Sequence, residues 1–191
     1  MKTTFILAGA GIIVAILALV FLLPRGGLPP GTPSQHPSAS QPSSRSEGQA
    51  TDTFTRLAGL SLVDYEGNAV SLADYRGKPL VINSWAVWCP FCRNELPDFA
   101  ALQEEFGDTL TVIAIDRQEP LQKAKAYTDE LALTNRMLFL LDSSDSFYRA
   151  IGGFSMPETI FVNGNGEIVV HKRGPMDLAE MREHANKIIT R

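Results

Sequence analysis

The 191 residues include only two cysteines, Cys89 and Cys92, and three histidines that lie far from them in the sequence. A structural zinc site takes four ligands, usually as two pairs of Cys or His. No second pair accompanies the two cysteines, so such a site is excluded. Basic residues are not in excess either, since the formal net charge is −4. This balance argues against nucleic acid as a partner.

Long hydrophobic runs are also scarce, and the one that stands out covers nineteen residues, 5–23, after Lys2. As a helix it would be about 28 Å long, close to the roughly 30 Å hydrocarbon core of a bilayer. A cleaved signal peptide is the alternative, but it has an apolar core of about 7–15 residues and a small-residue cleavage site, which residues 20–23 do not offer. We therefore expect a single uncleaved membrane anchor over residues 1–23. The rest of the chain would then be extracytoplasmic, in the periplasm or on the outer face.

Residues 24–50 have almost no large apolar side chains and are rich in Pro, Ser and Gly. A segment of this composition cannot bury enough apolar surface to offset the entropy lost on ordering. We expect a disordered linker there, followed by one folded domain over residues 51–191.

Apolar runs and turn signals alternate along this domain. They predict a hairpin around the Gly67-Asn68 turn, strands at 80–82, 110–115 and 137–141, helices from the cysteines to Phe106, at 120–131 and at 144–151, a hairpin over 159–170 and a helix from Asp177. Strands that alternate with helices predict an α/β fold. Its mixed central sheet would be flanked by helices on both faces and preceded by an N-terminal β-hairpin extension.

Cys89 and Cys92 are two residues apart where a predicted buried strand runs into a predicted helix. A disulfide that closes so short a loop removes little entropy from the unfolded chain, so the pair is a poor structural link and a good redox couple. Cys89 falls at the expected N-cap and Pro90 at the first helical position. The free N–H groups and the helix dipole there lower a thiol pKa from about 8.5 to roughly 3.5–7.5. We predict that Cys89 attacks and Cys92 resolves.

The segment Trp85-Ala-Val-Trp-Cys-Pro-Phe-Cys-Arg-Asn-Glu-Leu-Pro97 resembles the active-site segment of thioredoxin-like proteins. It is most similar to the membrane-anchored TlpA/ResA/DsbE branch. The resemblance runs from about Ala58 to the C-terminus and includes Gly153-Phe-Ser-Met-Pro-Glu-Thr159. It implies a thioredoxin-like fold and thiol–disulfide exchange with protein cysteines. The Cys89–Cys92 disulfide would be the redox group, without another cofactor.

Several roles carry over from the resemblance by position. Pro157 matches the family's cis-proline, so we expect a cis Met156–Pro157 bond beside the disulfide and a Met156 backbone that binds substrate. Glu95 matches an acidic residue near the thiols. A partly buried carboxyl there has a raised pKa and can pass protons. Asn83 stands where thioredoxin has a buried aspartate, which makes Glu95 its natural replacement. Trp88 would shield the disulfide and help to dock the substrate.

The resemblance favours a reductase, for instance one that reduces apocytochrome c thiols before haem attachment. Its electrons would come from a membrane donor of the CcdA/DsbD kind. An oxidising or isomerising role stays open. A Cu(I)-binding protein is the alternative from another class, with His171 as the candidate third ligand. A peroxidase fits poorly, since Ala86 stands where peroxiredoxins have threonine.

Overall fold

The computed structural model describes residues 54–190, so the predicted anchor (1–23) and linker (24–50) lie outside the described residues. A short helical segment over 54–58 precedes β1 (Leu62–Asp64), β2 (Ala69–Val70), the 3₁₀ turn η2 (Leu72–Tyr75), β3 (Leu80–Trp85), α3 (Pro90–Phe106), the 3₁₀ turn η3 (Gly107–Thr109), β4 (Thr111–Arg117), α4 (Leu121–Glu130), β5 (Leu138–Asp142), α5 (Ser146–Ala150), β6 (Glu158–Val162), β7 (Ile168–Arg173) and α6 (Leu178–Ile189). The predicted strands and helices are all confirmed to within a few residues.

The strands form one seven-stranded mixed sheet in the order β2-β1-β5-β4-β3-β6-β7. Strand β4 runs parallel to both of its neighbours, β3 and β5. Strand β6 runs antiparallel to its two neighbours, β3 and β7. The predicted thioredoxin-like α/β fold is thereby confirmed. The N-terminal hairpin is joined to the sheet, because Val63 of β1 pairs with Leu141 of β5.

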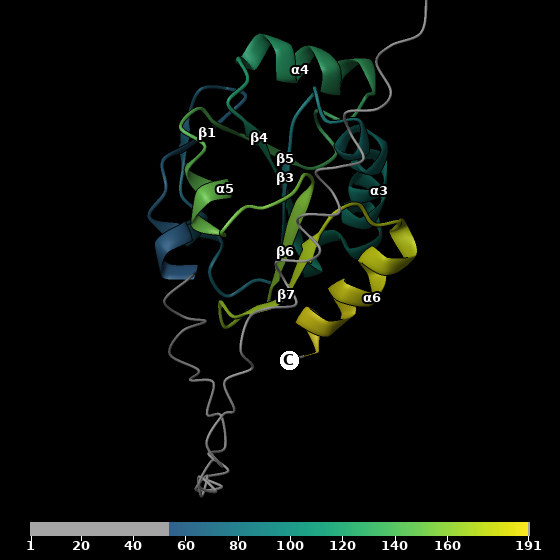
Figure 1. Cartoon of the computed structure of the whole chain (residues 1–191). Coiled ribbons are helices and arrows are strands. Elements are labelled where there is room, and N and C mark those ends of the chain that lie inside the picture. Colours follow the sequence, from purple (N-terminus) through teal and green to yellow (C-terminus); the bar gives the residue numbers. More distant parts are fainter. Residues whose placement is uncertain (1–53, 191) are drawn as a thin grey trace, which may run out of the picture. The chain divides into compact units, whose positions relative to one another are not determined.

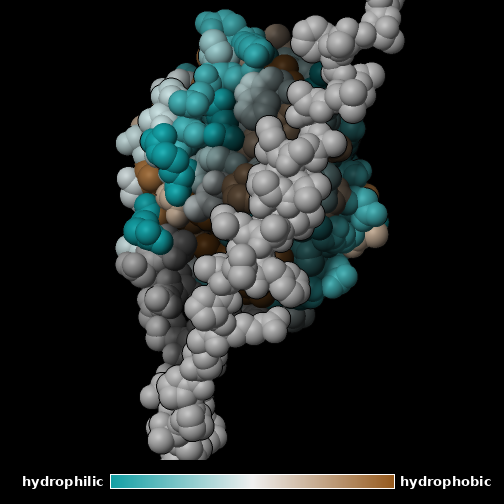
Figure 2. Space-filling view, viewed as in Figure 1, coloured by the Kyte–Doolittle hydropathy of each residue, from teal (hydrophilic) through white to brown (hydrophobic). Residues whose placement is uncertain are grey.

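Two hydrophobic cores lie on opposite faces of this sheet, because successive side chains of a strand point to opposite faces. Val81 and Val112 belong to one core, and the intervening Ile82 and Ile113 belong to the other. Helices α3, α4 and α6 pack on the first face, and α5 packs with residues 54–58 on the second (Figure 1). The outer surfaces of α4 and α6 in the view of Figure 2 are hydrophilic, as expected for helices that cover a sheet.

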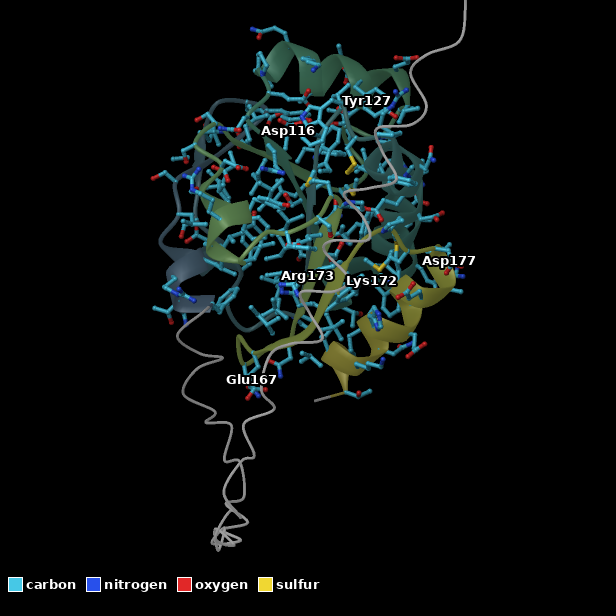
Figure 3. All side chains as sticks on the ribbon, viewed as in Figure 1. Asp116, Tyr127, Glu167, Lys172, Arg173 and Asp177 are labelled. Atoms are coloured by element: carbon cyan, nitrogen blue, oxygen red, sulfur yellow. A yellow bond between two sulfur atoms is a disulfide. The ribbon has the colours of Figure 1, made fainter. Side chains whose placement is uncertain are left out.

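The register of the central strands brings three connecting segments to one edge of the sheet. Trp85 at the end of β3 pairs with Asp116 of parallel β4, and Ser84 pairs with Glu158 at the start of antiparallel β6. The chain after β3, the chain after β4 and the chain before β6 therefore leave the sheet together. Figure 3 shows Asp116 at the end of the domain where α4 lies, with Glu167 of the β6–β7 turn at the opposite end.

The predicted membrane anchoring requires correction. A span needs a continuous apolar helix about 20 residues long, and no helix within residues 54–190 has that length and apolar character. The apolar run of residues 5–23, from which the span was predicted, lies outside the described residues. A single N-terminal span, and the extracytoplasmic location inferred from it, are therefore not supported.

Candidate active site

Cys89 and Cys92 lie at the start of α3 and are joined by a disulfide. Cys89 is the N-cap residue, and its Sγ accepts a hydrogen bond of 3.1 Å from the backbone N–H of Cys92. Pro90 takes the first helical position, where its missing N–H leaves no bond unmade. An N–H group and a helix N-terminus thus face the sulfur of Cys89, and both favour its thiolate when the pair is reduced.

Glu95 follows Cys92 by three residues, so the two side chains project from the same side of α3. Its carboxyl group is almost fully buried. Oε1 accepts a hydrogen bond of 2.9 Å from Asn83 Nδ2, and Oε2 accepts one of 3.3 Å from the Met176 N–H. Burial raises the pKa of Glu95 to about 8, against the smaller lowering effect of these two bonds. The carboxyl group is therefore mostly protonated at neutral pH, and it loses its proton when the pH rises to about 8.

A cavity of about 430 Å³ lies beside this carboxyl group, between the first turns of α3 and α6. Its lining consists of Phe91, Asn94, Glu95, Asp98, Pro175, Met176, Asp177 and Glu180. Figure 3 shows Asp177 at the start of α6. Glu95 is among the lining residues, although its side chain stays almost fully buried against Asn83.

The Met156–Pro157 peptide bond is cis, as expected from the resemblance. Met156 packs against the core cluster that contains both cysteines. Its backbone N–H and C=O form no hydrogen bond within residues 54–190, although β6 begins two residues later. An extended polypeptide could pair with these two groups as a strand pairs with an open sheet edge.

Glu158 has a role that the sequence did not reveal. Its side chain is fully buried, and Oε1 accepts hydrogen bonds from the Phe154 N–H (2.9 Å) and the Ser155 N–H (3.2 Å). Arg173 Nε donates to the same oxygen at 3.2 Å, so the carboxylate is paired with a cation. Glu158 thereby fixes the loop that leads to Met156. One feature of the sequence could have indicated this role: Glu158 is an acidic residue at the start of β6, which is buried on both faces.

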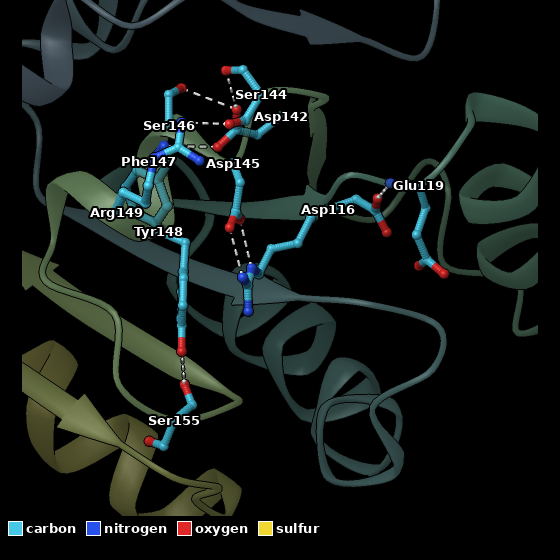
Figure 4. Close-up of polar contacts among 11 residues, drawn as sticks. Asp116, Glu119, Asp142, Ser144, Asp145, Ser146, Phe147, Tyr148, Arg149 and Ser155 are labelled. Carbon is cyan, nitrogen blue, oxygen red and sulfur yellow. Dashed lines mark hydrogen bonds and ion pairs between the residues drawn. The ribbon is translucent and has the colours of Figure 1, made fainter.

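A second unpredicted contact to this loop comes from α5. Tyr148 donates its hydroxyl proton to the Ser155 carbonyl oxygen at 3.1 Å (Figure 4). The guanidinium group of Arg117 lies 3.5 Å from the centre of the Tyr148 ring. Asp145 holds that guanidinium group through bonds of 2.6 and 2.7 Å to Nε and Nη2. The end of β4 and α5 thus jointly support the loop.

Three exposed aromatic side chains belong to the segments around the disulfide. Trp88 precedes Cys89 and is 57% exposed, and Phe91 between the cysteines is 58% exposed. Phe154, in the loop before Met156, is 84% exposed. The exposure of Trp88 is compatible with its predicted docking role, whereas Phe154 was not singled out from the sequence. Apolar groups left in water beside a reactive group are typical of a surface that binds another chain.

His171, the candidate copper ligand, lies on β7 with Nε2 3.3 Å from Glu158 Oε2. Within residues 54–190, no group of three or more His, Cys, Asp or Glu side chains is arranged to hold a metal ion. No contact in this part of the chain favours the copper-binding alternative.

The redox pair at a helix N-terminus, set in a thioredoxin-like sheet, defines the class as thiol–disulfide oxidoreductase. Comparison with known proteins bears this out: the chain belongs to the Redoxin family, whose model matches residues 42–189. It is 31% identical over 140 residues to the thioredoxin-like protein YneN of Bacillus subtilis, covering 72% of this chain and 77% of YneN. It is 27% identical over 128 residues to the thiol-disulfide oxidoreductase ResA of Geobacillus thermodenitrificans, covering 66% and 72%.

Among solved structures, a secreted Mycobacterium tuberculosis disulfide oxidoreductase homologous to E. coli DsbE superposes with a TM-score of 0.63. The superposition covers 70% of this chain and 98% of that one at 20% identity, and it shows the shared fold. The protein is therefore an enzyme of the thiol–disulfide oxidoreductase type, with protein thiols as its substrate class.

Proposed function

We propose that the enzyme is a protein-disulfide reductase in which Cys89 is the attacking thiol. The observation that carries this proposal is the 3.1 Å hydrogen bond from the Cys92 N–H to Cys89 Sγ at the N-cap of α3. The thiolate is the reactive form in disulfide exchange. Of the two thiols, the one that accepts a hydrogen bond from an N–H group at a helix N-terminus forms its thiolate more easily.

The reaction begins with both cysteines reduced. The Cys89 thiolate attacks one sulfur of a substrate disulfide, forms a mixed disulfide and releases the other substrate sulfur as a thiolate. The Cys92 thiol then loses its proton and attacks Cys89 Sγ, which restores the Cys89–Cys92 disulfide and releases the second substrate thiolate. Two electrons pass to the substrate, and each of its sulfurs ends as a thiol after taking up a proton.

Glu95, in its ionised form, is the proposed acceptor of the Cys92 proton. It lies on the same side of α3 as Cys92, one turn further on, and its raised pKa matches a proton exchange near neutral pH. The cavity that it lines provides the route by which this proton reaches water. Met156, with its free backbone N–H and C=O, would hold the substrate chain, and Trp88 would lie beside the attacked disulfide.

The physiological substrate is proposed from the family resemblance. The likeness to the TlpA/ResA/DsbE branch favours apocytochrome c thiols, and a donor of the CcdA/DsbD kind would return electrons to the enzyme. The similar proteins ResA and the sporulation protein of Bacillus subtilis are thiol-disulfide oxidoreductases, which supports the general activity.

Two matched variants test the reductase assignment. Cys92→Ser keeps the attacking thiol and should accumulate a mixed disulfide with insulin or another disulfide-bonded substrate, because the resolving thiol is missing. Cys89→Ser should form none and should lose insulin reduction. Full activity of Cys89→Ser would overturn the assignment.

A redox titration of Cys89/Cys92 against dithiothreitol and glutathione tests the direction of electron flow. A strongly reducing pair, oxidised by the glutathione buffer, supports the reductase. A pair that stays reduced in that buffer would instead identify an oxidant or isomerase.

A further inference from the structure

Asp116 and Glu119 form a buried carboxyl pair that the proposed reaction does not use. Asp116 lies near the end of β4 and is fully buried, and Glu119 lies just before α4 with 8% of its surface exposed. The Glu119 N–H donates to Asp116 Oδ1 at 3.1 Å (Figure 4). Asp116 Oδ2 is buried and has no hydrogen-bond partner within the described residues. Two carboxyl groups placed so close together in a buried site require an explanation.

The Glu119 carboxyl group contacts the turn that carries the attacking thiol. The Val87 N–H donates to Glu119 Oε2 at 2.6 Å, two residues before Cys89. The turn itself is closed by a 3.1 Å bond from the Cys89 N–H to the Ala86 carbonyl oxygen. Glu119 thus connects the chain after β4 to the chain after β3, at the edge of the sheet where Cys89 emerges.

The charge of the pair depends on its neighbours. Lys123 on α4 forms an ion pair with Glu119 Oε1, while the Tyr65 hydroxyl group interacts electrostatically with both carboxyl groups and with Asp129 of α4. Burial and the adjacent Glu119 carboxyl raise the pKa of Asp116 to about 8. Asp116 is therefore mostly protonated at neutral pH.

The two residues that pair with Asp116 in the sheet carry no charge. On the two strands beside β4, Trp85 and Leu141 pair with Asp116. Lys123 is thus the cation that faces the pair, and it offsets one carboxylate but not two.

We propose that Glu119 is a positioning residue for Cys89, and that a proton on Asp116 keeps the Glu119 carboxylate bonded to the Val87 amide. When Asp116 ionises, two carboxylates repel each other in a buried site. Glu119 then moves away from Val87, and the turn loses its link to β4. Cys89 Sγ is no longer held against the Cys92 N–H, and its thiolate loses stabilisation. The inference rests on the proposed function in taking Cys89 as the attacking thiol.

The test is the pH profile of Cys89 alkylation by iodoacetamide in the full chain. Cys92→Ser leaves Cys89 as the single thiol, and Glu95→Gln removes the other carboxyl group whose pKa is about 8. In this background, the rate constant is proportional to the thiolate fraction, which is followed separately by ultraviolet absorbance. Both should fall below a single-proton titration curve as the pH rises through about 8, because the thiolate loses stabilisation when Asp116 ionises.

Three further substitutions are then compared in that background. Asp116→Asn cannot ionise and keeps an oxygen that accepts from the Glu119 N–H, so it should abolish the fall near pH 8. Glu119→Ala removes the acceptor for Val87 and should lower the rate by up to about tenfold at pH values below the thiol pKa, as expected for the loss of one hydrogen bond to a charged group. Glu119→Gln keeps an acceptor oxygen and should restore most of that rate. Glu130→Gln, an exposed acid at the end of α4, is the matched control and should change nothing.

Coincident profiles for the background, Asp116→Asn and Glu119→Gln would overturn the inference. If Glu119→Ala does not fold, Glu119→Gln and Asp116→Asn still decide it, since both keep the shape of the pair. Insulin reduction by the unaltered protein is measured in parallel. Its absence would refute the proposed function alone, because the alkylation profile does not require a substrate disulfide.

Discussion

The ring of Tyr148 packs against Gly153 so closely that a Cβ atom at Gly153 would overlap it. The same side chain donates its hydroxyl proton to the Ser155 carbonyl oxygen at 3.1 Å. Arg117 lies over the ring from β4. These contacts tie the loop before Met156 to two elements of the sheet-and-helix framework. The open backbone of Met156 is therefore held in place by residues that do not themselves face the disulfide.

Tyr148→Phe tests the hydroxyl group alone. The ring and its contact with Gly153 remain, and the bond to the Ser155 carbonyl is lost. A hydrogen bond of this kind contributes about 1 kcal/mol, which corresponds to a factor of about five. We expect the KM for insulin to rise by about that factor, with kcat and the redox potential of the cysteine pair unchanged. Tyr75→Phe on η2 is the control, and a fall in kcat at constant KM would contradict the loop-positioning role.

Gly153→Ala tests the close packing. The added methyl group meets the Tyr148 ring, and overpacking of this kind costs about 1–3 kcal/mol of unfolding free energy. Urea denaturation should show this loss. In a Tyr148→Ala background the cost should disappear, because the overlapping ring is gone. Gly164→Ala, whose Cβ would make only ordinary contacts, is the control. An equal loss in both backgrounds would show that the ring is not the cause.

Most of the fold could be predicted because its signals are local. The buried run Leu80–Ile82, the Cys89 N-cap and the Asn163–Gly166 turn each lie within a few residues, and the structure has a strand, a helix start and a hairpin at these places. Met156–Pro157 was expected to be cis only through resemblance, and it is.

The hydrogen bonds that hold the site together could not be predicted from local signals, because they connect distant parts of the chain. Glu95 bonds to Met176 across 81 positions, and Glu119 bonds to Val87 across 32. A buried glutamate and an exposed one look alike in the sequence until the register of the strands is known. For the same reason, the sequence did not predict that Glu158, in the Gly153–Thr159 segment, would hold the loop before Met156.

Glu95→Gln should change how stability depends on pH. Burial raises the pKa of Glu95 to about 8 in the folded protein, from an ordinary value of 4.5. Between these values the folded state binds more protons than the unfolded state, so the unfolding free energy falls as the pH rises. This contribution is fully present below pH 4.5 and is lost by about pH 8. The difference in unfolding free energy between Glu95→Gln and the unaltered protein should therefore shift in favour of Glu95→Gln over this window, by up to a few kcal/mol at about 1.36 kcal/mol per pKa unit.

Urea denaturation of oxidised protein at several pH values measures this difference. Glu66→Gln, an exposed glutamate in the β1–β2 turn, serves as the control and should give a constant difference. A constant difference for Glu95→Gln as well would show that the carboxyl group ionises in the folded state as it does in water.

Glu158→Ala should be strongly destabilising. The substitution leaves the Phe154 and Ser155 N–H groups without their acceptor and removes the partner of Arg173. Each N–H group left without its acceptor costs about 1–3 kcal/mol, whereas Arg173 is half exposed and can be solvated. The expected result is a loss of that size in unfolding free energy, together with a raised KM for insulin. Glu66→Ala is the matched control. A loss below about 1 kcal/mol, the usual size for a surface change, would mean that the loop keeps its position without Glu158.

Backbone pairing at Met156 predicts a specific sensitivity in the substrate. In a disulfide-bonded peptide, N-methylation removes one amide donor at a time along the residues that flank the cysteine. Because the N–H and C=O of Met156 are unpaired within residues 54–190, a single substrate position should respond, with a KM raised about tenfold as expected for one lost hydrogen bond of about 1.4 kcal/mol. Methylation of the other positions, and Met156→Ala in the enzyme, should change KM less than about threefold. Uniform effects along the peptide would instead indicate that the exposed aromatic side chains, Trp88 among them, provide the binding.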